Sequence, residues 1–178
     1  MPSPQHTVTL TTPFTWDGAL ARPDEVAVLR LRDDGDAVEL RVSAPFHGDP
    51  PPPGSPGPND GLWGYEVVEL FIAGPGAPVP YVEVELGPHG HHLVLTLAGV
   101  RSPTARALPL DYTAERRGDR WVGVARIPRT LLPPEPWTAN ATAIHGQGEG
   151  RVYLSGVPLP GPAPDFHQPG RFSPLRLP

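Results

Sequence analysis

Apolar and polar side chains alternate in short runs along the chain, which is the pattern of half-buried β-strands. In the run YVEVEL, three apolar residues point to one face, whereas Tyr81, Glu83 and Glu85 point to the other. Two turn sequences, DDGD and RGD, separate such runs and are typical of antiparallel hairpins. The runs predict strands over residues 25–32, 37–44, 65–72, 81–86, 91–97, 110–116, 120–127, 141–145 and 151–157, with an edge strand over 172–177.

The register between two of these strands follows from their alternation, because only residues 87–90 (GPHG) connect them. We expect Leu86 to lie opposite His91, since this pairing brings the apolar faces of the two strands together. The same register makes Glu85 and His92 cross-strand neighbours on the polar face.

Proline and glycine are abundant, with 28 prolines and 20 glycines among 178 residues. No proline-free window is long enough for a helical bundle or a coiled coil. Residues 45–58 and 158–170 hold many of the prolines, and we expect long ordered loops there; Phe46 and Trp63 would anchor the first loop on the sandwich. The predicted fold class is all-β: one antiparallel β-sandwich domain over residues 1–178, with long proline-rich loops and little helix.

Charge and composition exclude several kinds of partner. The net charge is −5 and no basic stripe is present, so we expect no nucleic-acid partner. The absence of cysteine excludes disulfides, thiolate zinc sites and a cysteine nucleophile. No apolar run approaches the roughly 20 residues that span a bilayer, so we expect no membrane partner. Residues 1–6 do not follow the pattern of a signal peptide, which predicts a cytoplasmic protein.

Several motifs occur in an order typical of one family. They are SAPF (43–46), LW (62–63), YEVVE (65–69), YVEVEL (81–86), PHG (88–90), AIHG (143–146) and PDFH (164–167). In these motifs the chain resembles the uncharacterised family of the human chromosome 4 open reading frame 33 product, over roughly residues 14–172. That resemblance brings no established activity with it.

A more distant resemblance concerns EVVELF (66–71), YVEVEL (81–86), Trp121 and the segment FHQPGRF (166–172). These residues are similar to family 9 carbohydrate-binding modules and to the related DOMON β-sandwiches. The resemblance implies a two-sheet sandwich that binds sugars, or haem in some DOMON members. The sugar modules hold their ligand between two tryptophans, whereas only Trp63 stands near such a position here. Met1 is the only methionine and no haem ligand pair is evident, so we expect no cofactor.

The candidate ligand-binding site is the acidic and aromatic face of the predicted sheet. Several carboxylates placed side by side repel one another unless a cationic or hydroxyl-bearing group lies between them, and tyrosines add stacking surfaces and phenolic hydrogen bonds. His145 and His167 join the set through their motifs, and Trp63 lies at its edge. The expected site residues are Trp63, Tyr65, Glu69, Tyr81, Glu83, Glu85, His92, His145 and His167.

Two classes of function remain open for this face, with a protein-interaction domain as a third. A binding module for a small polar or carbohydrate-like ligand is favoured over a sugar-active enzyme that uses Glu and His as acid and base. The competing structural explanation is a solvated sheet face with weak Glu–His pairs. Metal binding stays unknown, because His91 and His92 point to opposite faces of one strand and cannot share an ion.

Overall fold

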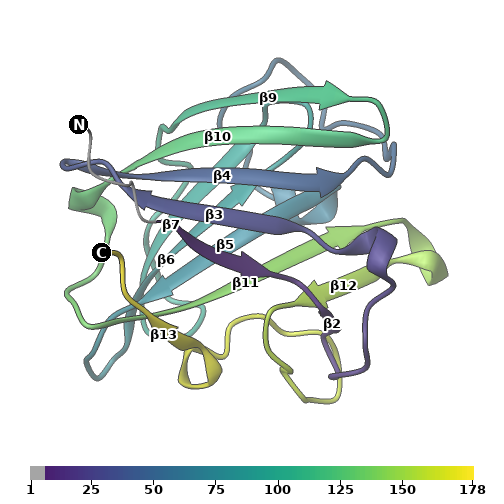
Figure 1. Ribbon diagram of the computed structural model, residues 1–178. Helices are drawn as coiled ribbons and strands as arrows, with labels where there is room; N and C mark the ends of the chain where they lie inside the picture. The colour runs from purple at the N-terminus through teal and green to yellow at the C-terminus, as the bar shows by residue number, and fades with distance from the viewer. Residues whose placement is uncertain (1–6) are drawn as a thin grey trace.

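The computed structural model describes residues 7–178 and consists of two antiparallel β-sheets packed face to face (Figure 1). Residues 1–6, on which the expectation of a cytoplasmic protein rested, lie outside the described residues. The smaller, 5-stranded sheet has the order β1 (Val8–Thr11), β3 (Val28–Asp33), β4 (Ala37–Pro45), β10 (Arg120–Pro128), β9 (Asp111–Arg117).

The larger, 8-stranded sheet supplies the second layer. Its order is β2 (Phe14–Thr15), β12 (Val152–Ser155), β11 (Trp137–His145), β5 (Val67–Ala73), β6 (Pro80–Leu86), β7 (His92–Ala98), β8 (Pro103–Ala105), and β13 (Ser173–Leu175) also pairs with β11. Helix in residues 7–178 is limited to short 3-10 turns, namely η1 (Pro23–Glu25), η2 (Leu62–Gly64), η3 (Arg129–Leu131), η4 (Gly148–Gly150) and η5 (Pro169–Arg171). None of these turns is long or apolar enough to cross a membrane.

The predicted fold class is confirmed, and most predicted strands lie within two or three residues of their observed bounds. The strand expected from residue 25 begins only at Val28, because Pro23–Glu25 form the 3-10 turn η1 with a proline in its first turn. Strands β1, β2 and β8 were not predicted, since each has four residues or fewer.

Alternating apolar side chains fill the space between the two sheets. Val82, Val84 and Leu86 of β6 face this layer and are fully buried, together with Trp121 of β10 from the opposite sheet. Burial of each such side chain contributes about 1.5–3 kcal/mol, so this layer supplies most of the driving force for folding.

A second apolar cluster covers the other face of the larger sheet. Phe71, Leu93 and Leu95 project outward from β5 and β7, and Leu159 and Phe166 from the second proline-rich loop pack over this face. The strands β5, β6 and β7 are therefore buried on both faces, as the almost continuous burial of their residues shows.

The predicted register between β6 and β7 is wrong by one residue. Leu86 pairs with His92, and Glu85 pairs with Leu93. The connection includes one residue more than expected, because Gly87 N–H donates to the His91 carbonyl at 2.9 Å and closes the turn. A shift of one residue exchanges the two faces of a strand, so His92 lies on the side opposite Glu85.

The first proline-rich loop packs on the sandwich through backbone hydrogen bonds. Asn59 N–H donates to the His92 carbonyl at 2.8 Å, and His92 N–H donates to the Gly57 carbonyl at 3.0 Å. At the start of the loop the buried Glu66 carboxylate accepts hydrogen bonds from the backbone N–H groups of residues 47, 48 and 49, at 3.0, 3.0 and 3.2 Å. These contacts hold the loop beside η2, which carries Trp63.

Candidate functional site

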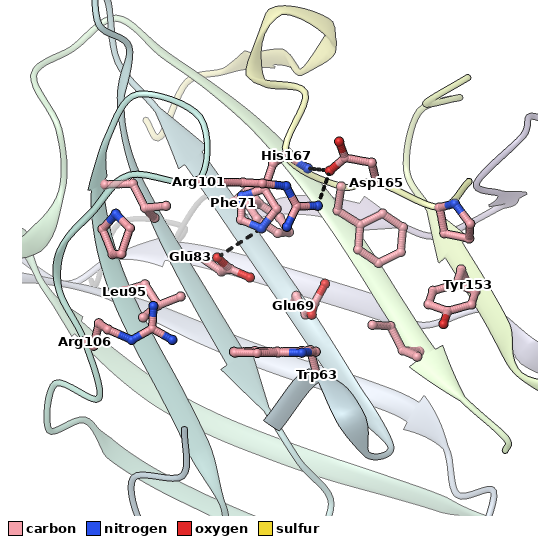
Figure 2. Close-up of a pocket in the computed structure, with 15 residues that line it drawn as sticks. Trp63, Glu69, Phe71, Glu83, Leu95, Arg101, Arg106, Tyr153, Asp165 and His167 are labelled. Carbon is pink, nitrogen blue, oxygen red and sulfur yellow. Dashed lines mark hydrogen bonds and ion pairs between the residues drawn. The ribbon is translucent and has the colours of Figure 1, made fainter. Parts of the chain in front are cut away.

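A cavity of about 370 Å³ opens on the outer face of the larger sheet. Its polar lining consists of Glu69, Glu83, Arg101, Arg106, Asp165 and His167, and its apolar lining includes Trp63, Phe71, Leu95, Leu97, Ile144, Tyr153 and Phe166. Figure 2 shows Glu69 and Glu83 at the centre, with Trp63 on one side and Arg101, Asp165 and His167 on the other. The cavity therefore has an acidic floor, aromatic walls and charged groups near its mouth.

Strand alternation places the carboxylates on the cavity floor. Glu69 and Phe71 of β5 share the outer face, whereas Val68 and Leu70 face the core between the sheets. Glu85 pairs directly with Glu69 across the two strands. Carboxylate oxygens of Glu69, Glu83 and Glu85 all lie within 4.8 Å of one another, and we call these three residues the glutamate triad.

Burial dominates the electrostatics of the glutamate triad. It raises the pKa of Glu69 to about 8 and that of Glu83 to about 7, and it raises the pKa of Glu85 well above its usual value. The neighbouring carboxyls raise the pKa values of Glu69 and Glu85 further. The Thr142 hydroxyl donates to Glu69 Oε2 at 2.5 Å and partly offsets the rise in the pKa of Glu69. Without a cation, the triad therefore keeps at least one proton at neutral pH.

A hydrogen-bonded network holds His167 at the cavity wall. The Tyr81 hydroxyl and His167 Nδ1 share a hydrogen bond of 2.8 Å, and Arg101 N–H donates to the same hydroxyl at 3.1 Å. Asp165 Oδ1 accepts from the His167 backbone N–H at 3.0 Å and from the Arg101 guanidinium at 2.8 Å. Burial, with Arg101 nearby, lowers the pKa of His167 to about 4, so its imidazole is neutral at pH 7. The Nε2 atom of this ring lies 3.8 Å from Glu83 Oε2.

Most of the residues predicted for the site lie in or beside the cavity. Four of them line it, namely Trp63, Glu69, Glu83 and His167. Glu85 joins the two lining glutamates, and Tyr81 reaches the cavity through its hydrogen bond to His167. Trp63 lies at the edge, as expected, with 44% of its surface exposed. Tyr65 packs against the outer apolar cluster but is not among the lining residues.

The placement of His92 at this site is wrong. His92 projects between the two sheets, where its ring meets the edge of Tyr112 at 6.1 Å. The error follows directly from the register of β6 and β7, and it removes the proposed contact between Glu85 and His92.

His145 also lies away from the cavity. Its ring stacks on His47 at 3.5 Å, and its Nε2 atom lies 3.7 Å from Glu25 Oε1. Its side chain has the same parity along β11 as the core residue Ala143, so it faces the smaller sheet. The AIHG motif therefore contributes Ile144 to the cavity wall and not its histidine.

Four lining residues with a polar side-chain group were missed, because three of them stand in loops and one in a short strand. Arg101 and Arg106 follow β7 and flank β8, and Asp165 stands in the second proline-rich loop. Asp165 belongs to the PDFH motif, so the motif that indicated His167 also contained its neighbour. Arg101 has a left-handed backbone conformation with φ of 55°, which is uncommon for an arginine and is not predicted by any pattern in the sequence. Tyr153 lies on β12 and required the strand order to be known.

The solved structures with this fold define its class. A putative carbohydrate-binding protein from Bacteroides uniformis superposes with a TM-score of 0.70 at 16% identity, covering 96% of this chain and 85% of that chain. A family 9 carbohydrate-binding module from Caldicellulosiruptor kristjanssonii, solved in complex with cellotriose, has a TM-score of 0.56 at 15% identity, covering 88% of this chain and 77% of that chain. The protein is therefore a β-sandwich of the carbohydrate-binding-module type in its fold.

Sequence comparison identifies the family. No model of a known protein family matches the chain. The UPF0462 protein C4orf33 homolog of Mus musculus is 45% identical over 91% of this chain and 88% of its own length. The human UPF0462 protein C4orf33 is 42% identical over 86% of this chain and 80% of its own length. The chain belongs to the UPF0462 (C4orf33) family, which confirms the family resemblance seen in its motifs.

Proposed function

We propose that this protein binds a small, hydroxyl-rich, carbohydrate-like ligand in the cavity over the glutamate triad. The observation that carries the proposal is the combination of buried carboxyls on the floor with aromatic walls in one concave site. Its volume of about 370 Å³ lies in the range of roughly 300–1,000 Å³ typical of small-molecule sites.

The side chains of the cavity can contact both the hydroxyl groups and the apolar C–H surface of a sugar ring. Protonated and ionised carboxyls can donate to and accept from hydroxyl groups, and Arg106 at the mouth can donate to them. The exposed indole of Trp63 offers an apolar face for the C–H surface of a ring. Tyr153 and Phe166, which meet edge to face at 6.2 Å, supply an aromatic wall where a second tryptophan is absent.

Solved structures with the same fold support this proposal by analogy. Two solved structures of a family 9 module from Caldicellulosiruptor kristjanssonii with this fold are described as complexes with cellotriose and with glucose. At 15% and 12% identity they establish the fold, so the ligand class of this chain rests on its own cavity.

A thermal-shift screen against monosaccharides and oligosaccharides, including glucose and cellotriose, tests the proposal. A sugar that binds the native state raises the melting temperature by mass action. Trp63→Ala should abolish this shift while leaving the melting temperature of the free protein nearly unchanged, because Trp63 is partly exposed. Leu20→Ala is the matched control, since Leu20 is 80% exposed and does not line the cavity. No shift with any sugar, or an equal shift in Trp63→Ala, would refute the proposal.

Glycoside hydrolysis is a second candidate, and one specific observation favours it. Carboxyl oxygens of Glu69 and Glu83 lie within 4.8 Å of each other, close to the roughly 5–5.5 Å between the carboxyls of retaining glycosidases. The raised pKa of Glu69, about 8, suits a general acid. Release of a chromophore from aryl glycosides, lost in Glu83→Gln, would establish hydrolysis; binding without release would leave the protein a binding module.

A further inference from the structure

The glutamate triad is an unusual arrangement for two adjacent strands. Glu69 and Glu85 stand directly opposite each other, and Glu83 lies two residues from Glu85 on the same face. Like charges at such positions destabilise a sheet, so β5 and β6 pair in spite of these three side chains. A group that lies among the carboxylates would turn this repulsion into attraction.

Several triad oxygens are buried without a partner. Glu85 is 0% exposed, and among the described residues no donor from outside the triad reaches either of its carboxylate oxygens or Glu83 Oε2. Glu83 and Glu85 can therefore pair with each other only by sharing a proton. Only Glu69 is fixed by a hydroxyl, that of Thr142. Buried carboxylates are normally paired with a cation, hydrogen-bonded or bound to a metal ion.

The nearby arginines are engaged elsewhere. Arg101 forms an ion pair with Asp165 at 2.8 Å, and Arg106 forms one with Asp60 at 2.8 Å. Within residues 7–178, no arginine forms an ion pair with a member of the triad, and the nearest imidazole nitrogen, His167 Nε2, lies 3.8 Å from Glu83 Oε2. The protein therefore supplies three acidic side chains at one point and no counter-charge in contact with them.

We propose that Glu69, Glu83 and Glu85 form a binding site for a hard divalent cation, with Ca²⁺ as the best match. Carboxylate oxygens are the ligands of hard cations, and Ca²⁺ accepts them at about 2.3–2.6 Å in irregular geometry. Two oxygens on opposite sides of such an ion are about 5 Å apart, which agrees with the 4.8 Å limit of the triad. The Thr142 hydroxyl orients Glu69, as groups around metal ligands commonly do.

The position of this cation connects it with the cavity without depending on a sugar. Glu69 and Glu83 line the cavity, so coordination positions not used by the protein face its interior and are open to water or to ligand oxygens. The competing arrangement is a triad that shares protons and holds no ion. Titration with a metal salt alone distinguishes the two.

The experiment uses the full chain, stripped with EDTA and exchanged into metal-free buffer at neutral pH. Calorimetric titration with CaCl₂ should show saturable binding of one ion, at least about tenfold tighter than that of MgCl₂, because Mg²⁺ requires near-octahedral ligands. Tb³⁺, a probe for hard oxygen sites, should give luminescence on excitation of tryptophan, since Trp63 lines the same cavity. Excess Ca²⁺ should displace this signal and raise the melting temperature by about 5 °C.

Variants place the ion at the triad. Glu85→Gln and, separately, Glu83→Gln keep the side-chain volume and should each weaken Ca²⁺ binding at least about tenfold. Glu115→Gln is the matched control, because Glu115 is 66% exposed and pairs with Arg117 on the surface; this variant should bind Ca²⁺ like the wild type. The wild-type titration is decisive even if a triad variant does not fold.

Three results would overturn the proposal. They are the absence of saturable binding by the wild type, binding that persists unchanged in both folded triad variants, and binding of Zn²⁺ without any binding of Ca²⁺. The sugar screen is run in both EDTA and CaCl₂, so a sugar response without a Ca²⁺ response would refute the cation site alone. A Ca²⁺ response without a sugar response would refute only the carbohydrate proposal.

Discussion

Raising the pH from 7 to 8.5 is expected to lower the free energy of unfolding of the metal-free protein. Burial raises the pKa of Glu69 to about 8 and of Glu83 to about 7, against an ordinary value of 4.5. Folding therefore favours their protonated forms, and the resulting stability is fully present below pH 4.5 and is lost as the pH rises through 7 and 8. Glu85, whose pKa is raised further, acts in the same direction.

The size of this effect follows from the pKa values. Between pH 7 and 8.5, release of the remaining protons from Glu69 and Glu83 costs about 1–2 kcal/mol. His145 and His167 act in the opposite direction, because burial lowers their pKa values to about 4 from 6.5. The stability that these two histidines contribute is lost only as the pH falls below 6.5, so it is almost constant between pH 7 and 8.5.

Urea unfolding followed by tryptophan fluorescence, in EDTA at pH 7, 7.75 and 8.5, measures this effect. The double variant Glu69→Gln/Glu83→Gln should reduce the slope of unfolding free energy against pH, because two of the three titrating groups are removed. Glu115→Gln, on the exposed face of β9, should keep the wild-type slope. A wild-type stability that stays constant or increases from pH 7 to 8.5 would show that the triad is not held in its protonated form.

Three further substitutions test other parts of the structure. Glu66→Gln replaces one carboxylate oxygen that accepts backbone N–H groups with an NH₂ group, and it should cost about 2 kcal/mol in chemical denaturation; a variant as stable as the wild type would contradict this role. Tyr81→Phe should cost about 1 kcal/mol and shift the NMR signals of the His167 ring, whereas unchanged signals would count against the hydrogen bond between them. Gly74→Ala would place a Cβ atom close to the Pro134 carbonyl oxygen and should cost about 1–3 kcal/mol, and a wild-type melting temperature would disprove the close packing.

The fold was predictable because alternation and turn chemistry agree over most strands. In β5 and β6 the core-facing positions are apolar and the outer positions carry glutamates, so the pattern identifies the faces correctly. In β7, alternation identified the wrong side of the strand as the core face. Leu93, Leu95 and Leu97 look like a core face, but they lie under the loops on the outer side of the sheet. A strand that is buried on both sides offers no polar face from which its register can be determined.

Only those residues of the candidate site that lie on strands could be predicted from the sequence. Strand parity brought Glu69, Glu83 and Glu85 together before the structure was known. The loop residues Arg101 and Asp165 pair over 64 positions of sequence, and no local pattern encodes that contact. Loop residues of this kind are positioned by tertiary packing and not by local propensity.

The most direct test of the proposed carbohydrate site is an NMR titration of the ¹⁵N-labelled protein with the same sugar panel. Each sugar is added to about 10 mM, which would occupy most of a site with a Kd of about 1 mM or tighter. The account predicts that at least one sugar produces saturable shifts in the Trp63 indole N–H and in the backbone N–H groups of Phe166 and His167, which line the cavity. Spectra that do not change with any sugar, or shifts confined to the smaller sheet, would contradict it.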